Sequence, residues 1–140
     1  MIVYDGTGMI LGRLAAKVAK DVLLGEEVSV VNCADVIISG RKKSTLARET
    51  QKINRKGYPL KSAKHPRLPD RFVRRTIRGM LPWKQARGRE AYKRVLCYRG
   101  VPESFTNQKL IKVEGASAKK LPNLKFITVG EVCKSLGGKE

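Results

Sequence analysis

The apolar positions near the start of the chain recur at the spacing of a helix. Between Ile10 and Leu23 they fall every three or four residues, while the basic residues lie on the opposite face. Gly25 follows at the point where a glycine commonly ends a helix. The pattern predicts an amphipathic helix over residues 9–24, the best-defined element of the chain.

Short apolar runs rich in β-branched residues predict strands. The run at 28–33 is apolar at most positions, which is typical of a strand buried on both faces. The runs are residues 2–4, 28–33, 36–38, 95–98 and 125–129.

Further helices are predicted over residues 44–56, 69–81, 84–93 and 130–136. The apolar stripe of the first is narrow and consists of Leu46, Ala47, Thr50 and Ile53. Such a narrow stripe suits a helix on the outside of the domain with wide exposure to a partner. Pro69 is well placed to begin the second of these helices.

Strands that alternate with helices predict an α/β fold, with a small, mainly parallel sheet of about four strands between helical layers. No repeat, low-complexity tract or long linker divides the chain, so we expect one domain over residues 1–140. Residues 103–124 have no pattern that predicts a regular element.

The positive charge is concentrated in the middle of the chain. The net charge is +18 overall, of which residues 41–99 carry +17, against −2 for residues 1–40 and +3 for residues 100–140. A solubilising surface mixes both signs, so this segment indicates a surface that binds a polyanion, most commonly nucleic acid.

An anionic membrane is the next commonest partner of such a segment. No apolar run is long enough to span a bilayer, and the first residues lack the pattern of a signal peptide. The basic segment also lacks a bulky apolar face with which to enter lipid. We therefore expect no membrane partner.

Arginine outnumbers lysine between residues 67 and 99. Its planar fork of donors matches phosphate oxygens in pairs and can stack on bases. Tyr58, Trp83, Tyr92 and Tyr98 are interleaved with these basic residues. Stacking on unpaired bases and ordinary packing within the domain are both open for these aromatic side chains.

Residues that could hold a metal ion are few. Cys33, Cys97 and Cys133 lie far apart and His65 is the single histidine, so the ligand spacing of a zinc site is absent. The cysteines are typical of small core residues in a reduced, cytoplasmic protein. We expect His65, which lies among basic residues, to contact phosphate or solvent.

Candidates for catalysis are also few. Glu49, Asp70 and Glu90 are the three carboxylates of residues 41–99, and general acid–base catalysis needs titratable groups that converge in a pocket. We therefore predict that the chain is not an enzyme and takes no cofactor, metal or small-molecule substrate.

One motif supports an alternative. Gly6, Gly8 and Gly12 follow a predicted strand and open a helix, which approximates the turn that binds a dinucleotide pyrophosphate. The third glycine comes one residue late, and Asp35 lies beyond the position expected for the ribose-binding acid. A tight strand-to-helix turn explains the glycines as well, and a dinucleotide-binding α/β enzyme stays the alternative.

Several motifs resemble those of the universal large-subunit ribosomal protein L-thirteen family. The clearest is Gly79-Met80-Leu81-Pro82 in residues 77–82, followed by a basic helix and by the strand of residues 94–100. Residues 11–15, 31–42 and 127–132 are also similar to the family, so the resemblance covers nearly the whole chain. Residues 64–67 and the basic second helix look like archaeal members.

The resemblance implies a three-layer α/β/α sandwich that binds the large-subunit (23S-type) ribosomal RNA, beside neighbouring large-subunit proteins, in the cytoplasmic ribosome. It implies a structural role and support of subunit assembly. On this basis the basic side chains of the middle segment are the expected RNA-binding residues. They are Arg41, Lys42, Lys43, Arg48, Arg55, Lys56, Lys64, Arg67, Arg71, Arg74, Arg75, Arg78, Lys84, Arg87, Arg89 and Arg94.

Overall fold

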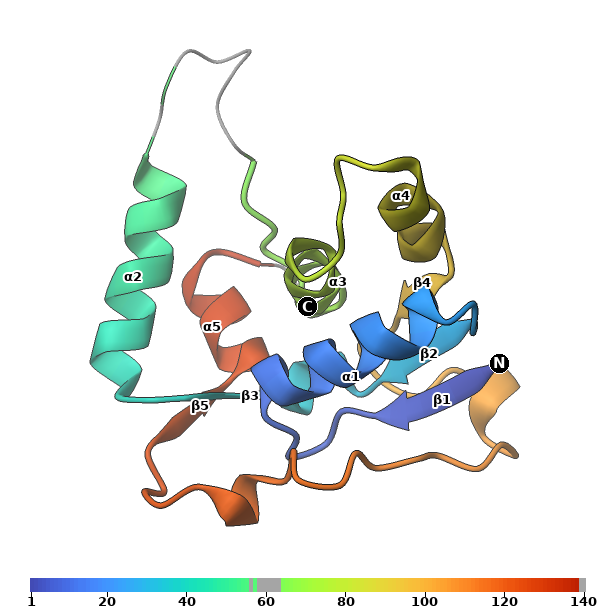
Figure 1. The fold of residues 1–140 in the computed structure, drawn as a ribbon. Helices are drawn as coiled ribbons and strands as arrows, with labels where there is room; N and C mark the ends of the chain where they lie inside the picture. Colours follow the sequence, from blue (N-terminus) through green and yellow to red (C-terminus); the bar gives the residue numbers. More distant parts are fainter. Residues whose placement is uncertain (56, 58–63, 139–140) are drawn as a thin grey trace.

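A computed structural model describes residues 1–55, 57 and 64–138 (Figure 1). The strands are β1 (Ile2–Asp5), β2 (Val28–Val31), β3 (Ile37–Ser39), β4 (Val95–Cys97) and β5 (Phe126–Thr128). The helices are α1 (Leu11–Leu23), α2 (Lys42–Asn54), α3 (Pro69–Gly79), α4 (Ala86–Lys93) and α5 (Val129–Ser135). Short 3-10 turns lie at Cys33–Asp35, Glu103–Phe105 and Ala118–Lys120. The predicted α/β class is confirmed.

β2 lies at the centre of a parallel sheet in the order β1-β2-β4. Val28 pairs with Ile2 on one side and with Val95 on the other. All four residues of β2 are buried, as the apolar run predicted. Helices and connecting segments therefore cover both faces of this strand.

β3 and β5 form a separate antiparallel pair, in which Ile38 lies opposite Ile127. The expectation of one sheet of about four strands is therefore corrected to three parallel strands and a two-stranded ribbon. Asn32 is the local cause, because its left-handed conformation (φ 54°) turns the chain into a 3-10 turn directly after β2. That turn also ends the strand before residue 33, and the three-layer sandwich stays a prediction.

α1 supplies the largest part of the core. Leu14, Val18 and Val22 are fully buried on the face that the sequence pattern predicted. The helix ends in a Schellman motif, since the N–H of Gly25 donates to the carbonyl of Val22 and the N–H of Glu26 to that of Asp21. Burying each large aliphatic side chain stabilises the fold by roughly 1.5–3 kcal/mol.

α2 stands apart from the other helices in Figure 1 and is widely exposed, as predicted. Its buried face differs from the predicted stripe. Thr45 and Glu49 are buried, whereas Ala47 and Thr50 are exposed. A buried carboxylate on a helix that was expected to face solvent needs partners, and these belong to the candidate site.

The connection from α3 to α4 turns through Gly79-Met80-Leu81-Pro82. Leu81 is buried against the core, while Met80 is 41% exposed. α4 then passes the turn very closely at Gly88, where a Cβ atom would lie 2.1 Å from the carbonyl oxygen of Pro82. A glycine is needed there because of close approach rather than an unusual φ angle.

Residues 103–124, which had no readable pattern, run along the free edge of β1 at the bottom of Figure 1. Ile111 bridges to Tyr4 and Ser117 bridges to Met9. Phe105 packs with Val3 and Val31 in a small second core. The segment therefore covers the sheet edge through isolated bridges, which leave no alternating sequence signal.

Candidate nucleic-acid interface

The glycine turn between β1 and α1 is closed by its own hydrogen bonds. The N–H groups of residues 6–10 each donate within the protein, for example Gly8 to the carbonyl of Asp35 (3.2 Å) and Ile10 to that of Ala116 (2.7 Å). A Cβ at Gly6 would lie 2.8 Å from the carbonyl oxygen of Val31. Because these five donors are already used, the hydrogen bonds favour a structural turn over a dinucleotide site.

The expected RNA-binding residues within the described part of the chain are carried by α2, α3 and α4 and by the segments next to them, and these three helices lie toward the top of Figure 1. We call the surface that these residues form the cationic face. Around α2 it includes Arg41, Lys42, Lys43, Arg48 and Arg55. Before and on α3 it includes Lys64, Arg67, Arg71, Arg74, Arg75 and Arg78. Lys84, Arg87, Arg89 and Arg94 lie before, on and after α4. Lys56 and Tyr58 lie outside the described residues.

Most of these side chains are exposed, and three are half-buried: Arg74, Arg78 and Arg94. Arg94 has a structural contact, because its Nη1 donates to the carbonyl of Val22 at the end of α1 (3.1 Å). Lys42 lies 3.4 Å from Glu131 of α5, in an exposed pair that adds little stability. The remaining exposed cations far outnumber the carboxylates beside them, so the face keeps a strong positive potential.

Two arginines of α3 are held by aromatic rings. The guanidinium of Arg74 lies 4.6 Å from the centre of the Tyr92 ring, and that of Arg78 lies 4.9 Å from the Trp83 ring. The edge of one ring meets the face of the other, with 4.9 Å between the Trp83 and Tyr92 centres. Base stacking and packing within the domain were both open for these rings. Both rings pack against an arginine and against each other, while Trp83 stays 37% exposed.

Glu49 of α2 is 2% exposed and holds three basic side chains around its carboxylate. It accepts hydrogen bonds from Arg48 Nε (3.1 Å) and Lys52 Nζ (2.9 Å), and its Oε2 lies 3.1 Å from His65 Nε2. Burial raises the pKa of Glu49, but the hydrogen bonds and charges of Lys52 and Arg48 outweigh it and lower that pKa below its ordinary value. His65 thus contacts a carboxylate rather than only phosphate or solvent, which corrects the sequence prediction.

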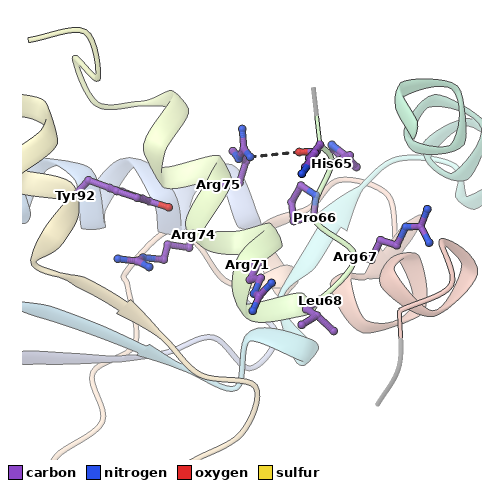
Figure 2. A pocket seen from close by; sticks show the side chains of 9 residues that line it. His65, Pro66, Arg67, Leu68, Arg71, Arg74, Arg75 and Tyr92 are labelled. Carbon is purple, nitrogen blue, oxygen red and sulfur yellow. Dashed lines mark hydrogen bonds between the residues drawn. The ribbon is translucent and has the colours of Figure 1, made fainter. Parts of the chain in front are cut away.

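A cleft of about 460 Å³ opens on the cationic face between residues 64–68, α3 and α4 (Figure 2). Arg71, Arg74 and Arg75 of α3 and Tyr92 of α4 are among the residues that line it, and in Figure 2 Arg75 points toward the chain before α3 while Arg74 points toward Tyr92. The Nη2 of Arg75 donates to the carbonyl of Lys64 (3.3 Å), which ties the chain before α3 to the helix. Among the described residues, none that lines this cleft is a carboxylate.

The three cysteine thiols are shielded from solvent to different degrees. Cys33 and Cys133 are buried and Cys97 is half-buried, and all three are free. Burial raises the pKa of Cys133 to about 11, so its thiol stays protonated at neutral pH. Within the described ranges, no group of histidine, cysteine and acidic residues is arranged to hold a metal ion. No helix in that part of the chain is long and apolar enough to cross a membrane.

The contacts that hold Glu49, His65 and Arg74 in place were not predicted from the sequence. Glu49 has Lys52 one turn away, and this spacing is a signal that could have found the pair. Its contact with His65 depends on the tertiary fold and has no local signal. The same holds for Arg74 and Tyr92, which come from different helices.

A small α/β domain whose cations are carried by one group of helices defines a class of basic proteins suited to a polyanionic partner. Sequence comparison makes the assignment specific: residues 1–104 match the pattern of the family described as ribosomal protein L13. The chain belongs to this family, which consists of structural ribosomal proteins rather than enzymes.

Archaeal proteins are among its relatives, and each of the following is described as large ribosomal subunit protein uL13. That of Methanococcoides burtonii is 44% identical over 139 residues, covering 99% of both chains. That of Methanocaldococcus jannaschii is 45% identical over 142 residues, again covering 99% of both. That of Archaeoglobus fulgidus is 43% identical over 136 residues, covering 96% of this chain and 86% of the relative. The resemblance to archaeal members is therefore confirmed.

Proposed function

We propose that this protein is a structural constituent of the large ribosomal subunit in the cytoplasm, and that its cationic face binds the large-subunit ribosomal RNA. The observation that carries the proposal is the large excess of cations over carboxylates on α2, α3, α4 and the segments between them. An anionic partner relieves the repulsion among them, and RNA phosphates are the matching ligand for arginine. Family membership and the names of its relatives support the ribosomal partner.

Most contacts are expected to reach the RNA backbone. Base edges in an A-form helix are poorly accessible, so basic side chains on exposed helices meet phosphates and 2′-hydroxyl groups. Exposed cations at the ends of α2 and on α4, such as Arg55 and Arg87, are placed for this role. By fixing the positions of RNA segments, such contacts support subunit assembly, and neighbouring ribosomal proteins complete the environment of the domain.

Binding of large-subunit ribosomal RNA at graded salt tests this proposal. We expect log Kd to rise linearly with log salt concentration, because each neutralised phosphate releases condensed counterions. The double variant R87Q/R89Q should bind more weakly, and its salt slope should fall by roughly one for each arginine that contacts a phosphate. Filter binding between about 50 and 200 mM KCl measures both quantities.

The matched control is K109Q/K119Q. It removes the same two positive charges from exposed positions in residues 103–124, away from the cationic face in Figure 1. Its affinity and slope should stay close to those of the unmodified protein. Equal losses in the two double variants would contradict a localised interface. Affinity that does not change over this salt range would contradict phosphate contacts altogether.

A separate measurement addresses the place of the protein in the ribosome. The protein should sediment with the large subunit and not with the small one. Large subunits reconstituted without it should accumulate as incomplete particles, and addition of the purified protein should restore them. Full assembly in its absence would contradict the supporting role.

A further inference from the structure

The cleft in Figure 2 has features that general attraction to phosphate does not require. Resting on the proposed function, we propose that this cleft binds a single unpaired nucleotide of the ribosomal RNA. In this arrangement the base stacks on the guanidinium of Arg74, and the phosphate lies between Arg71 and Arg75.

The charge of the lining identifies the ligand as an anion. Lys64, Arg67, Arg71, Arg74 and Arg75 line the cleft, and no described residue of the lining is acidic. Arg75 is fixed by its hydrogen bond to the carbonyl of Lys64, and that bond uses one of its five donors. Arg71 is exposed on the same helix one turn earlier, so its long side chain can turn toward a phosphate that Arg75 binds.

Arg74 is set up differently from its neighbours. Its guanidinium lies over the Tyr92 ring at 4.6 Å, and the side chain is half-buried. The Nε atom is buried and has no hydrogen-bond partner. Stacking on the ring fixes the plane of this guanidinium in one orientation. An arginine plane that is fixed on one side by a ring offers its other side to a base.

The aromatic partner is itself held in place. Trp83 meets Tyr92 in an edge-to-face contact, with their ring planes at 87°. The Tyr92 ring therefore keeps its position when a base stacks onto Arg74, and little side-chain ordering is needed on binding. The arrangement is a stacking platform with a preset orientation.

The size and the remaining lining fit one nucleotide. Pro66 and Leu68, in the segment that leads into α3, add apolar surface to the lining, which suits the faces of a base more than a phosphate. A volume of about 460 Å³ is in the range of pockets for small organic ligands. A double helix is far too wide for it, so the nucleotide must be unpaired and turned out of the stack.

The test compares AMP with ribose 5-phosphate, which carries the same phosphate and sugar without a base. On the full chain, NMR titration following the Arg74 Nε–H signal measures both affinities. AMP should bind at least about fivefold more tightly, since stacking of one base contributes a factor of that order or more. The R74K variant keeps the charge and loses the plane, so its affinities for the two ligands should agree within about twofold.

Three controls separate stacking from charge and from folding. Y92F keeps the ring and should keep the preference for AMP, whereas Y92L should lose it. R71Q should lower the affinities for AMP and for ribose 5-phosphate by the same factor, because it removes a phosphate contact. K109Q removes an exposed charge elsewhere and should change neither affinity. Circular dichroism shows which variants are folded. If both R74K and Y92L lose the preference for AMP, the loss cannot be explained by misfolding of a single variant.

Equal affinities for AMP and ribose 5-phosphate in the unmodified protein would overturn the stacking site and leave a phosphate site only. Signal changes outside the cleft would overturn its location. These outcomes are separate from the failure of the proposed function. If the protein retains ribosomal RNA on filters but shows no preference for AMP, only the nucleotide cleft is contradicted. If the protein does not bind the RNA, the proposed function is contradicted.

Discussion

Two glycines show how one missing atom sets the position of an element. At Gly88 a Cβ would collide with the carbonyl of Pro82, and at Gly6 it would meet the side chain of Val36 at 2.7 Å. Neither residue has a positive φ angle. Their role is to allow close approach, and in the case of Gly88 this fixes where α4 begins relative to α3.

The G88A variant should destabilise the protein. The methyl group cannot fit against the backbone of Pro82, so α4 must move away from the turn, at a cost of about 1–3 kcal/mol typical of overpacking. Urea denaturation followed by circular dichroism measures the change in the free energy of unfolding.

G12A is the matched control for this prediction. Gly12 also lies in the first turn of a helix, and a Cβ there would have no atom within 4 Å. Its stability should be unchanged or raised, by no more than about 1 kcal/mol, since alanine restricts the unfolded chain more than glycine does. If G12A and G88A lost stability equally, the close contact at Pro82 would not be the cause.

At the scale of elements, the sequence predicts a helix or strand well where the buried face of that element is apolar. α1 was predicted well because its buried face is apolar and continuous. α2 was predicted as a helix, but its buried face was wrong because it contains Glu49, whose burial depends on partners from elsewhere in the fold. β3 and β5 were found as runs, yet their pairing with each other apart from the main sheet joins segments far apart in the chain and has no local signal.

The candidate site divides in the same way. Its basic side chains could be named because charge along a chain is visible without a fold. Their arrangement could not, since the cleft and the stacking of Arg74 on Tyr92 join side chains from different helices. Which of the named residues contact RNA stays a prediction.

Glu49 makes the attachment of α2 dependent on pH. Its pKa is lowered in the folded protein, so its contribution to stability is complete above the ordinary value of about 4.5 and is lost as pH falls through the lowered pKa. At pH 7 the E49Q variant should be less stable by about 1–2 kcal/mol, a value reduced because Lys52 and Arg48 are half exposed.

Urea denaturation of both proteins from pH 7 to pH 3 measures this difference. The gap between the unmodified protein and E49Q should close below pH 4.5. Taking the difference is necessary because Asp5 also has a lowered pKa and loses its own contribution to stability in the same range. A gap that stays constant across the range would show that the ionised carboxylate is not what holds α2.

At the scale of the whole molecule, the net charge of +18 opposes folding in the absence of a partner. Screening by salt should therefore stabilise the free protein, and the urea midpoint should rise as KCl is increased from about 20 to 300 mM. The R87Q/R89Q variant, with less charge on the cationic face, should show a smaller rise. A midpoint that falls with salt would mean that the ion pairs around Glu49 and Glu131 contribute more than the repulsion among the cations.

The pairing of β3 with β5 has a consequence for biosynthesis. One strand is made early and its partner very late, with the cationic segment and β4 made between them. The ribbon, and the packing of α5 that follows it, cannot form until almost the last described residue has been synthesised. The arginine-rich helices therefore emerge from the translating ribosome before their scaffold is finished. A nascent chain in that state carries its charge without its shape, so it can attract polyanions before the surface proposed to bind RNA is complete.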